Sequence, residues 1–431
     1  MQGQLELTPT YAVQLDEKIL ANAHAVGDVD GDGVTELLVG SLIGKVAVFK
    51  IVQNHLIQWK SCDVNGSVTS ICLDMSIAQD TRIIIATAEG KCFVFRSVED
   101  NNVLQLCSKF TVALNICDIV HVNGELILAM RDGRVLVYRR NEADVNNVAE
   151  YVQVAQMEMN EEVEALIVLQ SELSNLNTSP QLLARCFSGR VFCIGGSNTA
   201  DANDKRAIVP WNGPPNDNDG ITFVVADIEL GGKRGMVALV SMNGLVSLFA
   251  SSGEKQWEFQ LPEAVVNADK LEMTASEGDR HDAIVVCTWS GQIYAFQSEQ
   301  RLVRFRMLLP ACSMFCVGIR DISGQIDPTI VGISTSGTVF VYHDVQETLI
   351  RGLQDSTLVL YAHFVVQIAF RVTADKVKES AVFVQLDSPE KRKAVMQKLH
   401  DAFPQFVVSV ETATPSVEDV IKAMLAIPVQ P

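Results

Sequence analysis

The chain has 431 residues, of which 48% are apolar, and its 34 basic and 52 acidic residues give a net charge of −18. The length is enough for one large domain and a smaller region, and the apolar content is enough for a sizeable core. The acidic excess argues against a nucleic-acid partner, because a phosphate backbone requires a basic face. The most apolar late stretch, residues 357–370, contains His363 and Gln367 and is too short to cross a bilayer, so no transmembrane segment is expected.

The amino terminus and the cysteines favour a cytoplasmic protein. The first 18 residues, MQGQLELTPTYAVQLDEK, have no apolar core of a signal peptide. None of the ten cysteines forms a CxxC pair, and several lie inside apolar runs. We expect them to be buried, reduced thiols.

Seven copies of one pattern fill most of the chain: an apolar run, a tight turn ending in Gly, and a second apolar run. They read ELLVGSLIGKVAVF, RIIIATAEGKCFVF, ELILAMRDGRVLVY, QLLARCFSGRVFCI, MVALVSMNGLVSLF, AIVVCTWSGQIYAF and TIVGISTSGTVFVY. Their turn glycines are spaced by 43 to 56 residues, at Gly44, Gly90, Gly133, Gly189, Gly244, Gly291 and Gly337. A period in this range is typical of a β-propeller, with one four-stranded sheet per repeat. The sequence therefore predicts an all-β fold, a seven-bladed β-propeller over residues 1–343, followed by a small C-terminal α/β or helical tail over residues 344–431.

The ring needs a strand that is shared between its two ends. No outer strand follows the last copy directly, whereas Thr10 to Leu15 reads as a strand ahead of the first blade. We therefore expect this N-terminal segment to complete the seventh blade.

A loop rich in aspartate precedes the first hairpin. Asp28, Asp30, Asp32 and Glu36 fall at positions 1, 3, 5 and 9 of GDVDGDGVTE, and Val34 offers a backbone carbonyl at position 7. Oxygen ligands at this spacing suit calcium. Aspartates also close turns by accepting hydrogen bonds from their own backbone, and this metal-free interpretation is the favoured one. A calcium site at these five residues stays the alternative, and no other cofactor is expected.

Two later segments are candidates for partner contacts. Residues 195–220 are rich in Asn, Asp, Gly and Pro and include Trp211, which either anchors a partner or covers its own blade. In the tail, Ser416 and Asp419 form a capping box for a last helix that carries Val420 and Met424. The apolar face of that helix either docks within the chain, which is somewhat favoured, or contacts another subunit.

Motifs of common enzymes are missing from the sequence. It has no GxSxG, no GxxxxGK[ST] and no HExxH. The segment Gly231 to Gly235, GGKRG, has no predicted helix after it and reads as a loop between strands. No catalytic residues and no enzymatic activity are therefore predicted.

An aspartate-rich loop before a propeller hairpin resembles the FG-GAP repeats of integrin α-subunits. More narrowly, HAVGDVDGDGVTELLVGSLIGKVAVFK (residues 24–50) resembles the first blade of the integrin-alpha FG-GAP repeat-containing protein 2 family. VVCTWSGQIYAF with the following RLVRF (residues 285–305) resembles the sixth blade of that family. The resemblance extends to about Gln346 and is weaker across the middle blades.

This resemblance implies a scaffold subunit of KICSTOR, an intracellular assembly at the lysosome surface that restrains target-of-rapamycin signalling when nutrients are scarce. The expected partners are other protein subunits, and any membrane association would be peripheral and through them. Two alternatives stay open: a calcium-stabilised, adhesion-type FG-GAP propeller, and a propeller subunit of a trafficking coat.

Overall fold

The computed structural model describes residues 7–15, 17–52, 55–77, 80–99, 101–141, 151–169, 182–195, 207–211, 222–274, 280–297, 302–307, 311–343 and 345–349. Nearly all of them belong to one compact unit, made of residues 5–299 and 303–350. The second unit lies outside the described residues apart from Leu302. The predicted tail, with Val420 and Met424, therefore lies outside the described residues, except for a helical turn at residues 346–349.

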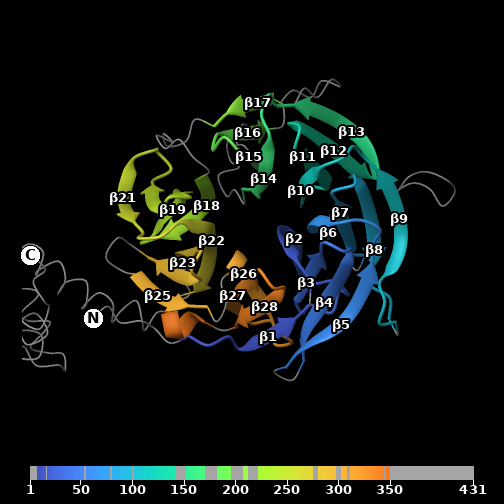
Figure 1. The fold of residues 1–431 in the computed structure, drawn as a ribbon, viewed down its shortest axis with the longest axis horizontal. Coiled ribbons are helices and arrows are strands. Elements are labelled where there is room, and N and C mark those ends of the chain that lie inside the picture. Colours follow the sequence, from blue (N-terminus) through green and yellow to red (C-terminus); the bar gives the residue numbers. More distant parts are fainter. Residues whose placement is uncertain are drawn as a thin grey trace, which may run out of the picture. The chain divides into compact units, whose positions relative to one another are not determined.

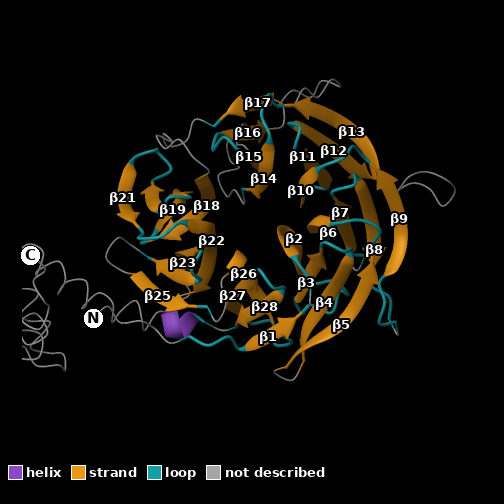
Figure 2. Cartoon of the chain, in the orientation of Figure 1, coloured by secondary structure: helices purple, strands orange, loops and turns teal. Residues whose placement is uncertain are grey.

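Within the described residues, 28 strands form seven four-stranded sheets arranged around a centre, as Figures 1 and 2 show. The predicted seven-bladed β-propeller is confirmed. Blades 1 to 4 contain, in chain order, β2 (Ile19–Gly27), β3 (Glu36–Ser41), β4 (Lys45–Val52), β5 (His55–Asp63); β6 (Val68–Asp74), β7 (Arg82–Thr87), β8 (Lys91–Arg96), β9 (Gln105–Thr111); β10 (Ile116–Val122), β11 (Glu125–Met130), β12 (Arg134–Arg140), β13 (Tyr151–Glu158); β14 (Val163–Val168), β15 (Leu182–Cys186), β16 (Val191–Gly195), β17 (Ala207–Pro210). Blades 5 to 7 contain β18 (Thr222–Leu230), β19 (Lys233–Ser241), β20 (Leu245–Phe249), β21 (Lys255–Gln260); β22 (Val265–Thr274), β23 (Arg280–Thr288), β24 (Gln292–Phe296), β25 (Leu302–Arg306); and β26 (Ala311–Arg320), β27 (Ile326–Ser334), β28 (Thr338–Tyr342) with β1 (Tyr11–Gln14).

The seventh blade closes the ring as the sequence predicts. Its strand order is β1-β28-β27-β26, so the N-terminal strand forms the outer edge of a sheet whose other strands come from the end of the propeller. Tyr11 pairs with Val341 and Gln14 pairs with Thr338 in an antiparallel register. The closure therefore joins residues more than 320 positions apart.

The turn between the second and third strands of each blade requires its glycine. All seven turn glycines have φ between +78° and +96°, a region that side chains with a Cβ rarely adopt. At Gly133 a Cβ would also lie 2.2 Å from the backbone oxygen of Met159, which belongs to the segment leading to the next blade. The glycine thus allows both the turn and the close passage of the following chain.

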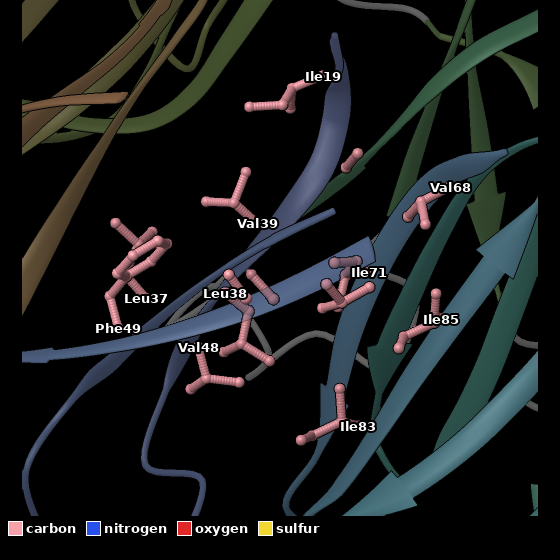
Figure 3. Close-up of a cluster of buried hydrophobic side chains, with 14 of the residues drawn as sticks. Ile19, Leu37, Leu38, Val39, Val48, Phe49, Val68, Ile71, Ile83 and Ile85 are labelled. Atoms are coloured by element: carbon pink, nitrogen blue, oxygen red, sulfur yellow. The ribbon is translucent and has the colours of Figure 1, made fainter. Parts of the chain in front are cut away.

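Each blade is buried on both faces, which is what the runs of apolar residues predict. All six residues of β3 are buried, and in β4 Val46 to Phe49 are buried. The resulting cluster joins blade 1 to blades 2 and 7. Figure 3 shows its part from blades 1 and 2, with Leu38 and Val48 of blade 1 and Ile71 and Ile85 of blade 2 among the labelled side chains. Blades in this arrangement stabilise one another only as a set.

Hydrogen bonds from polar side chains that follow a β-bulge link the inner strands of neighbouring blades. Among the described strands the inner strand has one extra residue near its start in five blades, between Val68/Ser70, Ile116/Asp118, Val163/Ala165, Val265/Asn267 and Ala311/Ser313. In four of these blades the residue after the bulge is polar and forms a hydrogen bond with a neighbouring blade. Asp118 accepts hydrogen bonds from the Ser70 hydroxyl at 2.8 Å and from the Leu166 N–H at 2.9 Å, which links blades 2, 3 and 4. Asn267 donates to the Met314 carbonyl at 2.7 Å, which links blades 6 and 7.

Candidate functional site

The aspartate-rich loop of blade 1 connects β2 to β3, and its own backbone closes it. The two Asp28 carboxylate oxygens accept hydrogen bonds from the Gly31 N–H at 2.7 Å and the Gly33 N–H at 2.8 Å. Asp32 accepts one from the Val34 N–H at 2.8 Å. The buried Glu36 accepts one from the Val29 N–H at 2.8 Å. These contacts are those of an Asx-type turn.

The loop also brings carboxylates together as the sequence predicts. Asp28, Asp30 and Glu36 each place one oxygen within 4.8 Å of the others. Asp32 contributes through a different contact, described below, and the Val34 side chain is buried. Whether these residues bind calcium stays a prediction, because their proximity alone is compatible with a turn.

A residue that the sequence analysis missed lies at the centre of this loop. The Lys50 ammonium, from β4, lies 3.1 Å from Asp30 Oδ2, 2.5 Å from Asp32 Oδ2 and 2.9 Å from Glu36 Oε1. The ring centroid of Trp59 lies 4.9 Å from the same nitrogen. The Lys50 side chain is only 12% exposed. The ammonium of Lys50 therefore forms ion pairs with three carboxylates in a partly buried environment.

The titration behaviour of the cluster reflects this arrangement. Burial raises the pKa of Glu36 to about 7, although the Val29 N–H and Lys50 act in the opposite direction. Burial by itself would lower the pKa of Lys50, but its contacts with Asp32 and Glu36 outweigh burial and raise it. For Asp32, the hydrogen bonds from Lys50 and the Val34 N–H outweigh burial and lower the pKa. Lys50 is thus a permanent cation at neutral pH.

Trp211, for which the sequence left a partner anchor and a cover for its own blade as alternatives, follows β17 and is only partly exposed. It packs against a cluster that includes Leu183, Val224 and Phe249 of blades 4 and 5. Its backbone N–H donates to the Val191 carbonyl at 2.9 Å. Much of its ring therefore covers the blades, and a role in binding a partner stays a prediction.

The turn face carries a set of side chains that the sequence analysis did not single out as partner contacts. We call it the turn-face arc: the residues two positions before the turn glycine in blades 3 to 6, which are Arg131, Phe187, Met242 and Trp289. Trp289 is 57% exposed and Met242 is 37% exposed. The Arg131 guanidinium lies 4.5 Å from the ring centroid of Phe187. Because the four turns lie at the same end of their sheets, these side chains share one face of the propeller.

Backbone hydrogen bonds hold the arc in place. The N–H groups of Arg131, Phe187 and Trp289 each donate, at 3.0 Å, to a carbonyl of the segment that enters the blade on the inside. The Met242 carbonyl accepts from the Val265 N–H at 2.9 Å. Tryptophan is enriched among the residues that anchor protein–protein interfaces. The signal that could have found the arc is the equivalent position of its residues relative to each turn glycine.

The inner strands enclose a cavity of about 520 Å³. Its lining includes Arg185, Phe223, Asp269 and Lys270. The Arg185 guanidinium lies 4.7 Å from the Phe223 ring centroid and 3.2 Å from a Glu164 oxygen, so it joins blades 4 and 5. Asp269 accepts hydrogen bonds from two backbone N–H groups. Arg185 and Asp269 are thus both engaged with groups of neighbouring blades.

Comparison with known proteins shows which family the chain resembles. A family profile for integrin-alpha FG-GAP repeat-containing protein 2 matches residues 221–347, which hold β18 to β28. A Mus musculus protein named KICSTOR complex protein ITFG2 is 21% identical over 381 residues, covering 78% of this chain and 84% of the mouse protein. The predicted family resemblance is confirmed. A Bos taurus protein of the same name is 20% identical over 382 residues, covering 78% of this chain and 70% of its own length.

Solved structures support the fold alone. The crystal structure of BBS1N in complex with ARL6DN matches with a TM-score of 0.54 and 16% identity, covering 79% of this chain and 97% of that chain. The crystal structure of Saccharomyces cerevisiae Sqt1 matches with a TM-score of 0.53 and 11% identity, covering 79% of this chain and all of that chain. Within the described residues, no helix has the length and apolarity needed to cross a membrane.

Proposed function

We propose that this protein is a non-enzymatic scaffold subunit of an intracellular complex that resembles KICSTOR. The observation that carries the proposal is the alignment of 78% of the chain with relatives that are named as KICSTOR complex proteins. A closed ring of blades suits this role, because it presents turns and loops on both faces to which other subunits can bind. In such a complex the protein would act in the nutrient-dependent restraint of target-of-rapamycin signalling.

We further propose that the turn-face arc is a contact surface of the scaffold. Trp289 and Met242 are exposed on neighbouring blades, and both are fixed through the segment before β22. Because the backbones of both residues are already held by hydrogen bonds, binding a partner would require little further ordering of the main chain. The proposed location is the cytoplasmic side of the lysosome, reached through partner subunits.

The test compares three tagged, full-length proteins expressed at equal levels: wild type, the double variant Met242→Ala/Trp289→Ala, and Ile322→Ala. Ile322 is 93% exposed in the loop between β26 and β27, at the opposite end of the sheets, and is the matched control. Affinity purification with quantitative mass spectrometry should recover KICSTOR subunits with the wild type and the control. The recovery of KICSTOR subunits with the double variant should be lower by about tenfold or more, because truncation of a central anchor costs roughly 2 kcal/mol or more of binding free energy.

Two results would contradict the proposal at different levels. If the wild type recovered vesicle-coat subunits and no KICSTOR subunit, the assignment of the complex would be wrong. If KICSTOR subunits were recovered equally with all three proteins, the complex would stand and the turn-face arc would be excluded as the contact surface.

A further inference from the structure

The spacing of the loop carboxylates left calcium as the alternative occupant of the loop between β2 and β3, and the structure provides a different cation for that position. Calcium requires six to eight oxygen ligands at about 2.3–2.6 Å. The loop has oxygens from Asp30, Asp32 and Glu36, but the Lys50 ammonium already lies within 3.1 Å of one oxygen from each of them. We propose that Lys50 is a built-in cation that takes the place of calcium, so that this propeller forms without a metal.

The remaining carboxylate of the loop supports the same conclusion. Each of the two Asp28 oxygens accepts a hydrogen bond from a backbone N–H group, from Gly31 and Gly33. Asp28 therefore closes the turn, and a metal that drew on both of its oxygens would compete with those donors. A divalent ion placed among the same oxygens would also lie beside a fixed ammonium and be repelled by it.

The ammonium matches the site in sign. Lys50 donates hydrogen bonds to Asp30 Oδ2 and Asp32 Oδ2, and it forms an ion pair with Glu36 Oε1. The Trp59 ring lies 4.9 Å from Lys50 Nζ, and the negative face of an aromatic ring favours a cation. Lys50 thereby ties the loop at the start of β3 to the far end of β4.

Blade 7 offers a comparison within the same chain. Its loop at the equivalent place, between β26 and β27, is closed by Asp321, whose Oδ1 accepts from the Ser323 N–H at 2.8 Å, the Ser323 hydroxyl at 2.7 Å and the Gln325 N–H at 3.0 Å. That loop is therefore an Asx turn of the usual kind. Blade 1 has more carboxylates than its turn needs, and Lys50 compensates their charge.

The experiment measures melting temperature and calcium binding for three full-length proteins: wild type, Lys50→Met and the control Lys45→Met. Lys45 lies on the same strand, its side chain is 65% exposed, and its nearest carboxylate, Glu17, is 3.8 Å away. Each protein is melted in EDTA and in excess calcium chloride, and each is titrated with calcium by isothermal calorimetry. Terbium gives a second readout, because Trp59 beside the loop can sensitise the luminescence of a bound ion.

The wild type and Lys45→Met should show no heat of calcium binding, no terbium luminescence and the same melting temperature in both buffers. Lys50→Met should melt lower in EDTA than Lys45→Met and should regain part of the loss in calcium. The proposal is overturned if the wild type binds calcium, if Lys50→Met melts like Lys45→Met, or if calcium leaves Lys50→Met unchanged. The wild-type titration requires no variant, so the proposal stays testable even if Lys50→Met does not fold.

Discussion

Asp118 is the residue whose environment most clearly predicts a pH effect. It is 8% exposed and follows the bulge in β10. Burial raises its pKa to about 6, even though its hydrogen bonds with Ser70, Ile119 and Leu166 act in the opposite direction. The folded protein thus binds this proton more tightly than the unfolded chain, in which the pKa of an aspartate is about 3.9. The contribution of Asp118 to the free energy of unfolding should therefore increase as the pH falls from 7 to 4.

The variant Asp118→Asn lacks this titration. The difference in free energy of unfolding between wild type and Asp118→Asn should shift in favour of the wild type by about 2 kcal/mol between pH 7 and pH 4. Urea denaturation at several pH values measures it, and the comparison cancels the other titrating groups. Parallel profiles for the two proteins would show that the Asp118 proton is bound equally in both states.

At the scale of the residue, the sequence predicted the turn glycines, because a local rule is enough to find them. It did not predict contacts between side chains on different strands. The loop carboxylates were found from their spacing, but Lys50 is 14 residues beyond Glu36 and was not connected with them. The register of the β3–β4 hairpin shows why Lys50 lies beside Glu36. Because Leu37 pairs with Phe49, the next positions outward are Glu36 and Lys50. Counting outward from the predicted turn would have brought the two together.

At the scale of the element, the hairpin turns make a sharp prediction about glycine. Gly133 and Gly124 both have positive φ, +90° and +77°. A Cβ at Gly133 would meet the Met159 oxygen at 2.2 Å, whereas a Cβ at Gly124 would have no heavy atom within 4 Å. Gly124→Ala should lower the free energy of unfolding by about 1 kcal/mol, the cost of the backbone conformation. Gly133→Ala should lower it by roughly 3 kcal/mol or more, because the following segment must also move.

Urea denaturation of the two variants and the wild type measures this difference. Equal losses would mean that the conformation of the turn, and not the close passage of the segment after β13, makes the glycine necessary. Since both substitutions add one methyl group at a positive-φ position, the comparison isolates the contact with the neighbouring chain.

The elements themselves divide into those that the sequence predicts and those that it does not. The second and third strands of each blade were predicted, because their apolar runs flank an identifiable turn. The bulges of the inner strands were not, since a bulge is an adjustment of register that leaves no distinct residue pattern. Asp118 and Asn267 carry hydrogen bonds between blades, yet nothing in the sequence around them distinguishes them from other polar residues of the strands.

At the scale of the whole molecule, ring closure by β1 predicts a large effect of a small deletion. The Thr10 N–H donates to the Val341 carbonyl at 2.8 Å, the Leu15 N–H donates to the Gly337 carbonyl at 3.1 Å, and the strand between them pairs with β28. Removal of residues 1–15 should lower the melting temperature by on the order of 10 °C, because it opens blade 7 and uncovers its apolar face.

Removal of residues 1–6 alone is the control and should leave the melting temperature nearly unchanged, since the paired strand is kept. A synthetic peptide of residues 7–18, added to the shorter protein, should restore part of the loss by pairing with β28. Calorimetry follows all three samples. A shorter protein that melts like the wild type would show that β1 is dispensable for the ring.

The number of blades and their closure followed from the repeat, because seven copies of a unit that cannot bury its own faces have few ways to fold. The turn-face arc did not follow, because exposure depends on which side chains the neighbouring blades leave uncovered. Trp289, next to the turn of the sixth repeat, is 57% exposed, and no feature of the repeat pattern indicates this. The sequence thus predicts the ring more completely than it predicts the surface.

The pairing of β1 with β28 also determines when the protein can finish folding during its synthesis. The ribosome makes β1 first, but the strand that receives it, Thr338–Tyr342, emerges more than 320 residues later. Throughout that interval a nascent chain exposes a strand edge that could pair with another chain. We therefore expect translation stopped before residue 338 to leave products with two open edges, which makes them natural clients of chaperones.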